Sequence, residues 1–106
     1  MNTLQYKEYI ELQVLESLTE NKTQTTISKE LVMAIGKVNY IANALIKKGF
    51  IKVGNFYNAE NKTKYKYLLT EKGFEEKINI TKKFIKIKKA EYEKMQEDLD
   101  KYESSI

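Results

Sequence analysis

The chain has 106 residues, a formal net charge of +4 and 32% charged residues, which fits one domain with a modest hydrophobic core. It contains no Cys and no His, and this excludes disulfides, thiolate chemistry, the usual pairs of nucleophile and base, and most transition-metal sites. No apolar run approaches the ~20 residues of a membrane span, and the first residues do not resemble a signal peptide, so we expect a cytoplasmic protein that is not an enzyme and needs no metal or cofactor.

Two helices are predicted at the start of the chain. Apolar residues at helical spacing indicate an amphipathic helix over about residues 4–20. The segment TENKT ends it, and the Thr23 hydroxyl can cap a short second helix on which Ile27 and Leu31 face one side. Only VMA separates this helix from the next periodic segment, which is the length of a helix-turn-helix connection.

A third helix is predicted over about residues 35–48. Its apolar stripe is formed by Val38, Ile41, Ala42 and Leu45. Lys47, Lys48 and Gly49 supply the cations and the glycine that are typical of a helix end. The opposite face carries Asn and Tyr side chains instead of the usual charged ones, which raises the question of what they contact.

From Phe50 the pattern changes to that of strands. The segments FIKVGNFY and KYKYLLT are rich in β-branched and aromatic residues, and the polar segment NAENKT lies between them. This order predicts a β-hairpin with a basic tip. Gly54 is expected to mark a β-bulge.

A long helix is predicted from about residue 71 to residue 103, with Thr70 as its cap and Gly73 tolerated in its first turn. Steps of three and four residues give a seam of ten positions, eight of them apolar or aromatic, which is typical of a coiled coil that pairs two copies. The expected dimer contacts are Ile78, Ile85, Tyr92, Met95, Leu99 and Tyr102. A second apolar row, Ile80, Phe84 and Ile87, suits contact with the helix's own domain. The alternative is a helix that folds back onto its own core, and the direction of pairing stays open.

The charges are unevenly distributed along the chain. Residues 36–72 hold eight Lys against two Glu, and residues 73–90 hold six Lys against two Glu, whereas residues 91–106 hold six acids against two Lys. A positive middle is typical of a surface that binds a polyanion. All 19 basic residues are Lys, so any base recognition would use Lys and the amides of Asn or Gln instead of Arg. An A·T-rich genome would favour the same composition, and the two explanations are compatible.

The order of helix, helix-turn-helix and basic hairpin is that of a winged helix. We therefore expect a mainly α (α+β) fold. A winged helix-turn-helix domain is expected over residues 1–73, and a long dimerisation helix is expected over residues 74–106. The segments GKVNY, ALIKKGFIKV and LLTEKG resemble winged-helix regulators of the MarR class, in particular its short branch associated with exopolysaccharide gene clusters. The resemblance implies sequence-specific binding of double-stranded DNA as a homodimer, with the third helix in the major groove and a wing over about residues 57–65 on the backbone or minor groove. Two positions depart from the family: Val32 stands where such turns usually have Gly, and Ala34 stands where Ser or Thr would cap the recognition helix.

The outward face of the third helix supplies the candidates for base contact. An Asn amide can pair with N6 and N7 of adenine together, which is worth ~1–3 kcal/mol of discrimination. These candidates are Lys37, Asn39, Tyr40 and Asn43. Phosphate contacts suit lysines and the N–H groups of helix N-termini, and they position a protein without specifying sequence. These candidates are Thr23, Gln24, Thr25, Gly36, Lys47, Asn61, Lys62 and Lys64. An ordinary solvated helix face is the alternative explanation for the outward Asn and Tyr side chains.

The expected partner is a pseudo-palindromic DNA operator whose half-sites lie about one helical turn, ~10 bp, apart. We expect A·T-rich half-sites because Arg is absent. Two other functions stay open: a winged helix that binds only protein, and a membrane-surface module, since KKFIKIKK over residues 82–89 interleaves cations with apolar residues. A hydrolase built on Asp and Glu alone has no positive support. The sequence does not indicate the promoter, the direction of regulation or a small-molecule effector.

Overall fold

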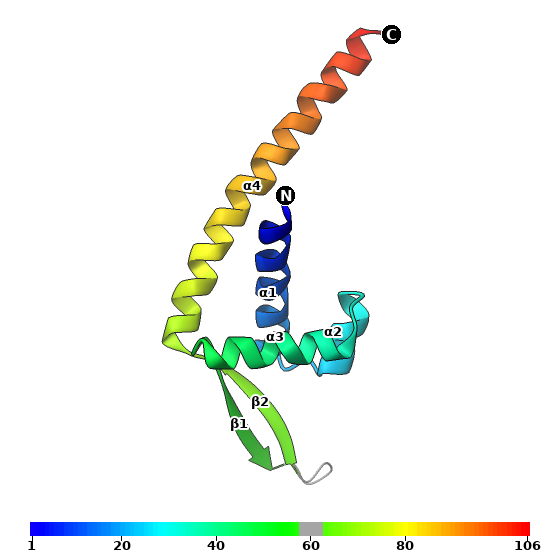
Figure 1. The fold of residues 1–106 in the computed structure, drawn as a ribbon. Helices are drawn as coiled ribbons and strands as arrows, with labels where there is room; N and C mark the ends of the chain where they lie inside the picture. The colour runs from blue at the N-terminus through cyan, green and yellow to red at the C-terminus, as the bar shows by residue number, and fades with distance from the viewer. Residues whose placement is uncertain (58–62) are drawn as a thin grey trace.

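The computed structural model describes the backbone of residues 1–57 and 63–106 and the side chains of residues 1–54 and 66–106 (Figure 1). The elements in chain order are α1 (Thr3–Thr19), α2 (Gln24–Glu30), α3 (Ile35–Lys47), β1 (Ile51–Tyr57), β2 (Thr63–Leu69) and α4 (Glu71–Ser104). The fold is mainly helical, with one two-stranded antiparallel hairpin and a long C-terminal helix. These elements are the ones that the sequence pattern predicts.

Side chains at the helix starts explain where three of the helices begin. At α1 the Asn2 side chain accepts from the Gln5 backbone N–H, and the Gln5 side chain accepts in return from the Asn2 N–H at 3.0 Å. The Thr23 hydroxyl accepts from the Thr26 N–H at the start of α2, and the Thr70 hydroxyl accepts from the Gly73 N–H at the start of α4. The predicted caps Thr23 and Thr70 are therefore confirmed.

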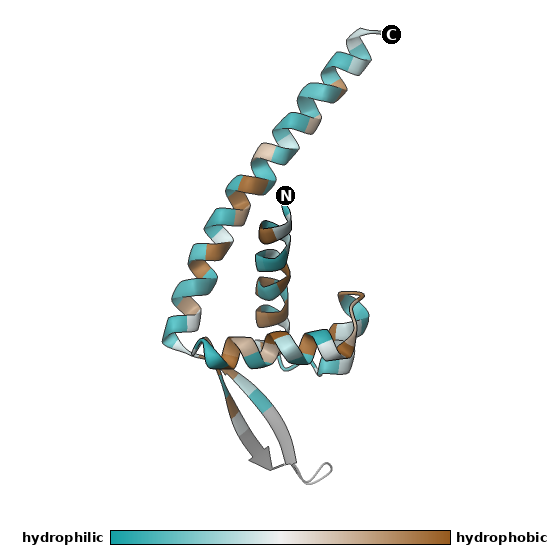
Figure 2. Cartoon of the chain, viewed as in Figure 1, coloured by the Kyte–Doolittle hydropathy of each residue, from teal (hydrophilic) through white to brown (hydrophobic). Residues whose placement is uncertain are grey.

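The core lies where α1, α2 and α3 meet, and Figure 2 shows hydrophobic segments along these helices. Leu18, Ile27 and Val38, one from each helix, are completely buried. The first strand adds Ile51, which is 1% exposed, so the hairpin is anchored at its base. All four residues of the predicted α3 stripe are buried. Truncation of a side chain such as Leu18 to Ala would cost ~2–5 kcal/mol of stability.

The hairpin pairs in a regular register from Ile51 opposite Leu69 to Tyr57 opposite Thr63. Each residue of β1 has one partner on β2, and Gly54 lies opposite Lys66. The expected bulge at Gly54 is therefore wrong. A bulge needs an extra residue on one strand, and the two strands have equal lengths of 7 residues.

The junction between the hairpin and α4 depends on Gly73. A Cβ at this position would lie 2.0 Å from the backbone oxygen of Phe50, which is far inside van der Waals contact. Thr70 holds the same segment, because its N–H donates to the Phe50 oxygen at 3.0 Å and its hydroxyl donates to the Gly49 oxygen at 2.5 Å. Gly73 is thus required by close packing, whereas its sequence position suggests only that a glycine is tolerated.

The two halves of α4 have different surroundings. In the first half, Phe84 is 3% exposed and its ring lies 5.1 Å from the ring of Tyr9 on α1. The N-terminal ammonium of Met1 donates to the Glu91 carboxylate at 2.6 Å, and this hydrogen bond lowers the pKa of Glu91. From Tyr92 to Ser104 every side chain is exposed except Asp98. The helix therefore leaves the domain after Glu91 and projects as a stalk (Figure 1).

Candidate nucleic-acid interface

The third helix divides its residues between the core and an open surface. Opposite its buried stripe lie Gly36, Tyr40, Asn43 and Lys47, and all four are exposed. Tyr40 is 71% exposed, although aromatic side chains are usually covered. The predicted outward face is therefore accessible to a large partner.

Asn39 lies at the edge of this face that borders α2 and the hairpin. The side-chain amide nitrogen of Gln24 lies 3.3 Å from the amide oxygen of Asn39 and 3.2 Å from the hydroxyl of Tyr67. Gln24 thus connects α2, α3 and β2 through two long hydrogen bonds. The oxygen of Asn39 thus accepts one hydrogen bond in this arrangement, and its NH2 group is left to donate elsewhere.

Asn43 differs from Asn39 in its surroundings. Within the described part of the chain, no side chain forms a hydrogen bond with Asn43, which lies one turn further along α3 and is exposed. Its amide oxygen and its amide nitrogen therefore have no side-chain partner among the described residues. Asn43 is the better candidate for a contact that needs a donor and an acceptor together.

Lys37 and Tyr40 lie toward the opposite edge of α3, near the start of α1. Together with Tyr6 and Ile10 they line a mostly apolar pocket of about 360 Å³. The four candidates for base contact therefore do not form one line. Asn39 borders the hairpin, Lys37 and Tyr40 lie toward α1, and Asn43 lies between these edges.

The turn that precedes α3 has a left-handed residue despite the absence of Gly. Val32 has φ 52° and is 89% exposed. Ser28 stabilises the turn through two hydrogen bonds to Met33. Its backbone oxygen accepts from the Met33 N–H at 3.0 Å, and its hydroxyl donates to the Met33 oxygen at 2.5 Å. Ala34 supplies no side-chain acceptor to the first N–H groups of α3. Val32 thus forms a strained turn, and α3 begins without a side-chain cap.

The candidates for phosphate contact at the start of α2 differ in their exposure and in the hydrogen bonds that they already form. Thr23 and Thr25 are exposed, whereas Gln24 is half-buried and its amide already bridges α3 and β2. The neighbouring Lys22 donates to Glu30 at 2.9 Å, and this hydrogen bond raises the pKa of Lys22. Lys22 is therefore engaged within the protein.

Several lysines surround the outer face of α3. Lys37 and Lys47 are exposed, and Lys48 lies 3.6 Å from Glu11. At the base of the hairpin, Lys52 and Lys66 are also exposed. The latter two extend the cationic surface and were not among the sequence candidates. The alternation of charged and apolar residues along each strand is the pattern that could have identified them.

The predicted contacts at the hairpin tip involve Asn61, Lys62 and Lys64. Asn61 and Lys62 lie outside the residues that the structure describes, and so does the side chain of Lys64. Gly36 is described, and apart from its chain neighbours and the backbone of its own helix no atom lies within 4 Å of the position that a Cβ would take there. The backbone at the start of α3 is therefore open to close approach.

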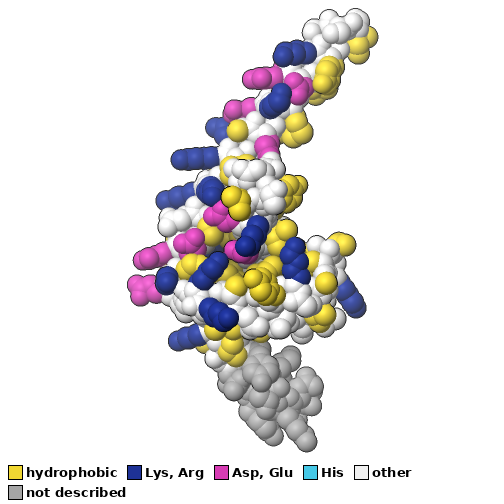
Figure 3. Space-filling model, viewed as in Figure 1, with side chains coloured by type: hydrophobic (Ala, Val, Ile, Leu, Met, Phe, Trp, Pro, Cys, Tyr) yellow, Lys and Arg dark blue, Asp and Glu magenta, His cyan; other side chains and the backbone are white. Residues whose placement is uncertain are grey.

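The predicted dimer contacts form a stripe along α4. The exposed fractions are 38% for Ile78, 61% for Ile85, 62% for Tyr92, 63% for Met95, 46% for Leu99 and 67% for Tyr102. In Figure 3 hydrophobic side chains follow one edge of the stalk. We call these six residues the α4 stripe.

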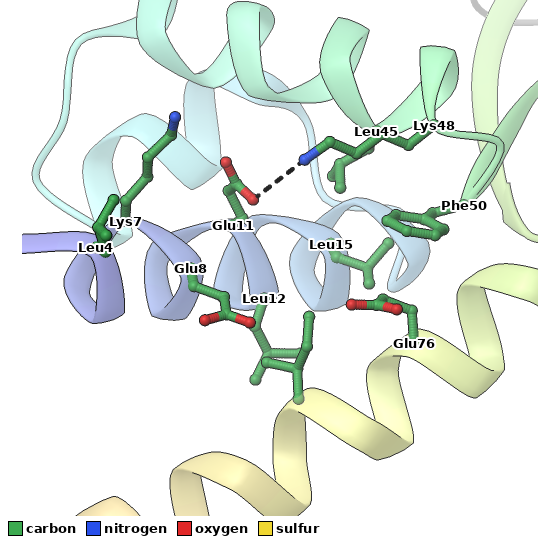
Figure 4. Close-up of a pocket in the computed structure, with 11 residues that line it drawn as sticks. Leu4, Lys7, Glu8, Glu11, Leu12, Leu15, Leu45, Lys48, Phe50 and Glu76 are labelled. Atoms are coloured by element: carbon green, nitrogen blue, oxygen red, sulfur yellow. Dashed lines mark ion pairs between the residues drawn. The ribbon is translucent and has the colours of Figure 1, made fainter.

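A pocket of about 290 Å³ lies between α1, α3 and α4 (Figure 4). Its floor is apolar, and three carboxylates, Glu8, Glu11 and Glu76, lie on its wall. The carboxylate of Glu11 lies 3.6 Å from the ammonium nitrogen of Lys48, and the carboxylate of Glu8 lies 2.6 Å from the ammonium nitrogen of Lys83. Two of the three carboxylates are thus neutralised, and the pocket offers no concentrated charge to a ligand.

The described residues contain neither a cluster of metal ligands nor a helix that could span a membrane. In residues 1–57 and 63–106, no group of three or more Asp or Glu side chains is placed to hold a metal ion. In the same ranges no helix combines the length and the apolar character of a membrane span.

Comparison of the sequence with protein-family models and with curated proteins finds no match.

Proposed function

We propose that the protein is a sequence-specific regulator of transcription that binds double-stranded DNA as a homodimer in the cytoplasm. In this proposal α2 and α3 form the helix-turn-helix of a winged helix, the hairpin is the wing, and the chain is related to the short MarR-class regulators that it resembles. The observation that carries the proposal is the exposed polar face of α3, flanked by exposed lysines. From Ile35 to Thr70 the sequence has seven Lys and one Glu, so a polyanion would meet little repulsion there.

In the proposed complex, α3 enters the major groove with its outer face toward the bases. The amide of Asn43 would accept from N6 and donate to N7 of an adenine. Asn39 would contribute its NH2 group and the second lone pair of its oxygen, because the first lone pair accepts from Gln24 at 3.3 Å. Tyr40 and Lys37 would contact neighbouring bases on the side nearer α1.

Contacts to phosphates would surround this face. Lys47 lies at the end of α3, and Lys52 and Lys66 lie at the base of the hairpin, so these cations border α3 and the wing. Thr23, Thr25 and the backbone near Gly36 would add hydrogen bonds. Such contacts fix the position of the protein, and they make affinity fall as salt rises.

The first test is to select bound duplexes from a random library and to compare variants on the selected operator and on unrelated DNA. For Asn43→Ala we expect a loss of ~1–3 kcal/mol in discrimination, a factor of roughly 5 to 150, with little change on unrelated DNA. Asn79→Ala is the matched control, because Asn79 is an exposed Asn on α4 and lies away from the proposed groove.

Lys47→Ala separates phosphate contact from base contact. We expect it to weaken binding to all duplexes alike, and to reduce the slope of log affinity against log salt by about 1 for each protomer. If Asn43→Ala and Lys47→Ala both keep the affinity, selectivity and salt slope of the parent protein, then α3 does not lie in the groove. Binding to anionic vesicles or to a protein without any binding to duplex DNA would contradict the proposal as a whole.

A further inference from the structure

The fourth helix carries opposite charges in its two halves. Residues 73–90 hold six Lys against two Glu, and residues 91–106 hold six acids against two Lys. The first half lies against α1, and the second half projects beyond it. The helix is thus a rod with a positive half next to the domain and a negative half at its tip.

The α4 stripe runs through both halves, with the polar residues Thr81 and Lys88 at the intervening seam positions of the first half. Its members recur at steps of three, four or seven residues from Ile78 to Tyr102, and each is at least 38% exposed. A long apolar stripe on an exposed helix indicates a partner helix. Beside the stripe, a groove of about 320 Å³ between α1 and α4 is lined by Tyr9, Thr81 and Ile85. The groove adjoins the end of the stripe that lies nearest the domain, and the polar side chains of Gln13, Glu16 and Lys88 also line it.

The residues that flank the stripe distinguish the two possible directions of pairing. With Ile78 at a heptad a position, Lys77 and Asp98 occupy g positions, and Lys82 and Glu103 occupy e positions. In a parallel pair each g residue faces the following e residue of the partner, so that Lys77 would face Lys82 and Asp98 would face Glu103. Both contacts would be between like charges.

An antiparallel pair reverses this result. There g faces g and e faces e. With full overlap of the two helices about residue 90, Lys77 lies five residues, ~7.5 Å along the axis, from the partner's Asp98, and Lys82 lies equally far from the partner's Glu103. These two contacts are between opposite charges and each occurs twice by symmetry, whereas Glu91 and Lys89 each lie near their own copy in the partner once. The same alignment places Ile78 beside the partner's Tyr102.

We infer that α4 pairs antiparallel with α4 of a second copy, so that the acidic tip of each stalk lies along the basic half of the other. The inference rests on the proposed homodimer and specifies its geometry. The second copy is the occupant that the charges favour, because it carries the complementary pattern on the same stripe. The partner's tip would then end beside α1 and the groove at Thr81.

The natural absence of Cys allows a direct test by disulfide formation in the full-length chain. Ile78→Cys and Tyr102→Cys change two exposed stripe positions. A disulfide requires Cα atoms within ~7 Å. In the antiparallel pair the two Tyr102 positions lie roughly 36 Å apart, at ~1.5 Å per residue. We therefore expect covalent dimers when the two variants are mixed, unfolded together and refolded, and few when each is oxidised alone.

The other outcomes contradict the inference in recognisable ways. Efficient self-linking of Tyr102→Cys alone would show a parallel stalk. A dimer that forms no disulfide in the mixture would exclude the proposed alignment. A parent protein that is monomeric in analytical ultracentrifugation would remove the homodimer itself, while its binding to the selected operator, measured separately, would still test the role of α3.

Charge reversal provides a second measurement that does not require oxidation. In the antiparallel pair, the double variant Lys77→Glu, Lys82→Glu should raise the dimer dissociation constant about tenfold or more. Adding Asp98→Lys and Glu103→Lys should restore it, because opposite charges again face each other. A parallel pair would show neither change, since like charges would replace like charges. Unaltered dimerisation of the double variant would therefore overturn the inference.

Discussion

Two residues show how backbone geometry constrains the sequence in opposite ways. Val32 adopts a left-handed conformation at φ 52°, which costs a β-branched residue about 1–2 kcal/mol. The turn keeps this conformation because Ser28 binds Met33 through both its backbone and its hydroxyl. Gly73 has an ordinary place inside a helix, yet only glycine fits against the backbone of Phe50. Strain is thus tolerated at the exposed turn and excluded at the crowded junction.

The junction makes a clear prediction for stability. Gly73→Ala should reduce the free energy of unfolding by about 3 kcal/mol, because the added methyl group would overlap backbone that cannot move without shifting α4 from the hairpin. Thermal unfolding followed by circular dichroism would show a Tm lower by roughly 13 °C. Gly36→Ala is the matched control, since its methyl group would enter open space, and it should stabilise the protein by about 0.5–1 kcal/mol. Equal effects of the two substitutions would refute the packing argument.

At the scale of elements, α3 is held mainly by packing. Its apolar stripe is buried and Gly49, at φ 78°, ends it in the left-handed conformation. Its first turn, however, has no side-chain cap, unlike the first turns of α1, α2 and α4. The N–H groups at this end remain available to an anion, which agrees with the proposed position of α3 beside DNA phosphates.

The missing cap can be supplied by one substitution. Ala34 already has the extended backbone of an N-cap, with φ −61° and ψ 140°, so Ala34→Ser should stabilise the protein by about 0.5–2 kcal/mol. Thr23→Ala should remove the existing cap of α2 and cost a similar amount. Chemical denaturation of the three proteins measures both effects. A destabilised Ala34→Ser variant would mean that the turn cannot hold the serine hydroxyl over α3.

The sequence predicts the elements well because their determinants are local. The caps Thr23 and Thr70 and the outward position of Asn43 follow from hydrogen-bonding chemistry and from helical spacing. The features that escape prediction depend on contacts between distant segments. Gln24 and Tyr67 are separated by 43 positions and meet only in the fold, so the sequence does not reveal that the oxygen of Asn39 accepts a hydrogen bond from Gln24. The same reason hides the requirement for Gly73.

At the scale of the whole molecule, the stalk dominates the shape. The extents are 64 × 27 × 21 Å and the radius of gyration is 18.0 Å, whereas a compact chain of this length would have a radius of about 13 Å. The last part of α4 carries exposed apolar side chains and lacks support from its own domain. Short helices in isolation are marginal in water. Folding of the stalk and association with a second copy should therefore be coupled.

This coupling predicts that stability depends on protein concentration. If the native state is a dimer, a hundredfold increase in concentration should raise the Tm by roughly 6 °C, because mass action favours the associated form. Met95→Glu combined with Leu99→Glu would place charges within the α4 stripe and should abolish this dependence, with loss of helical signal from the stalk. Glu97→Gln, outside the stripe, should retain it. A Tm independent of concentration in the parent protein would mean that α4 is stable alone, and the stripe would then need another explanation.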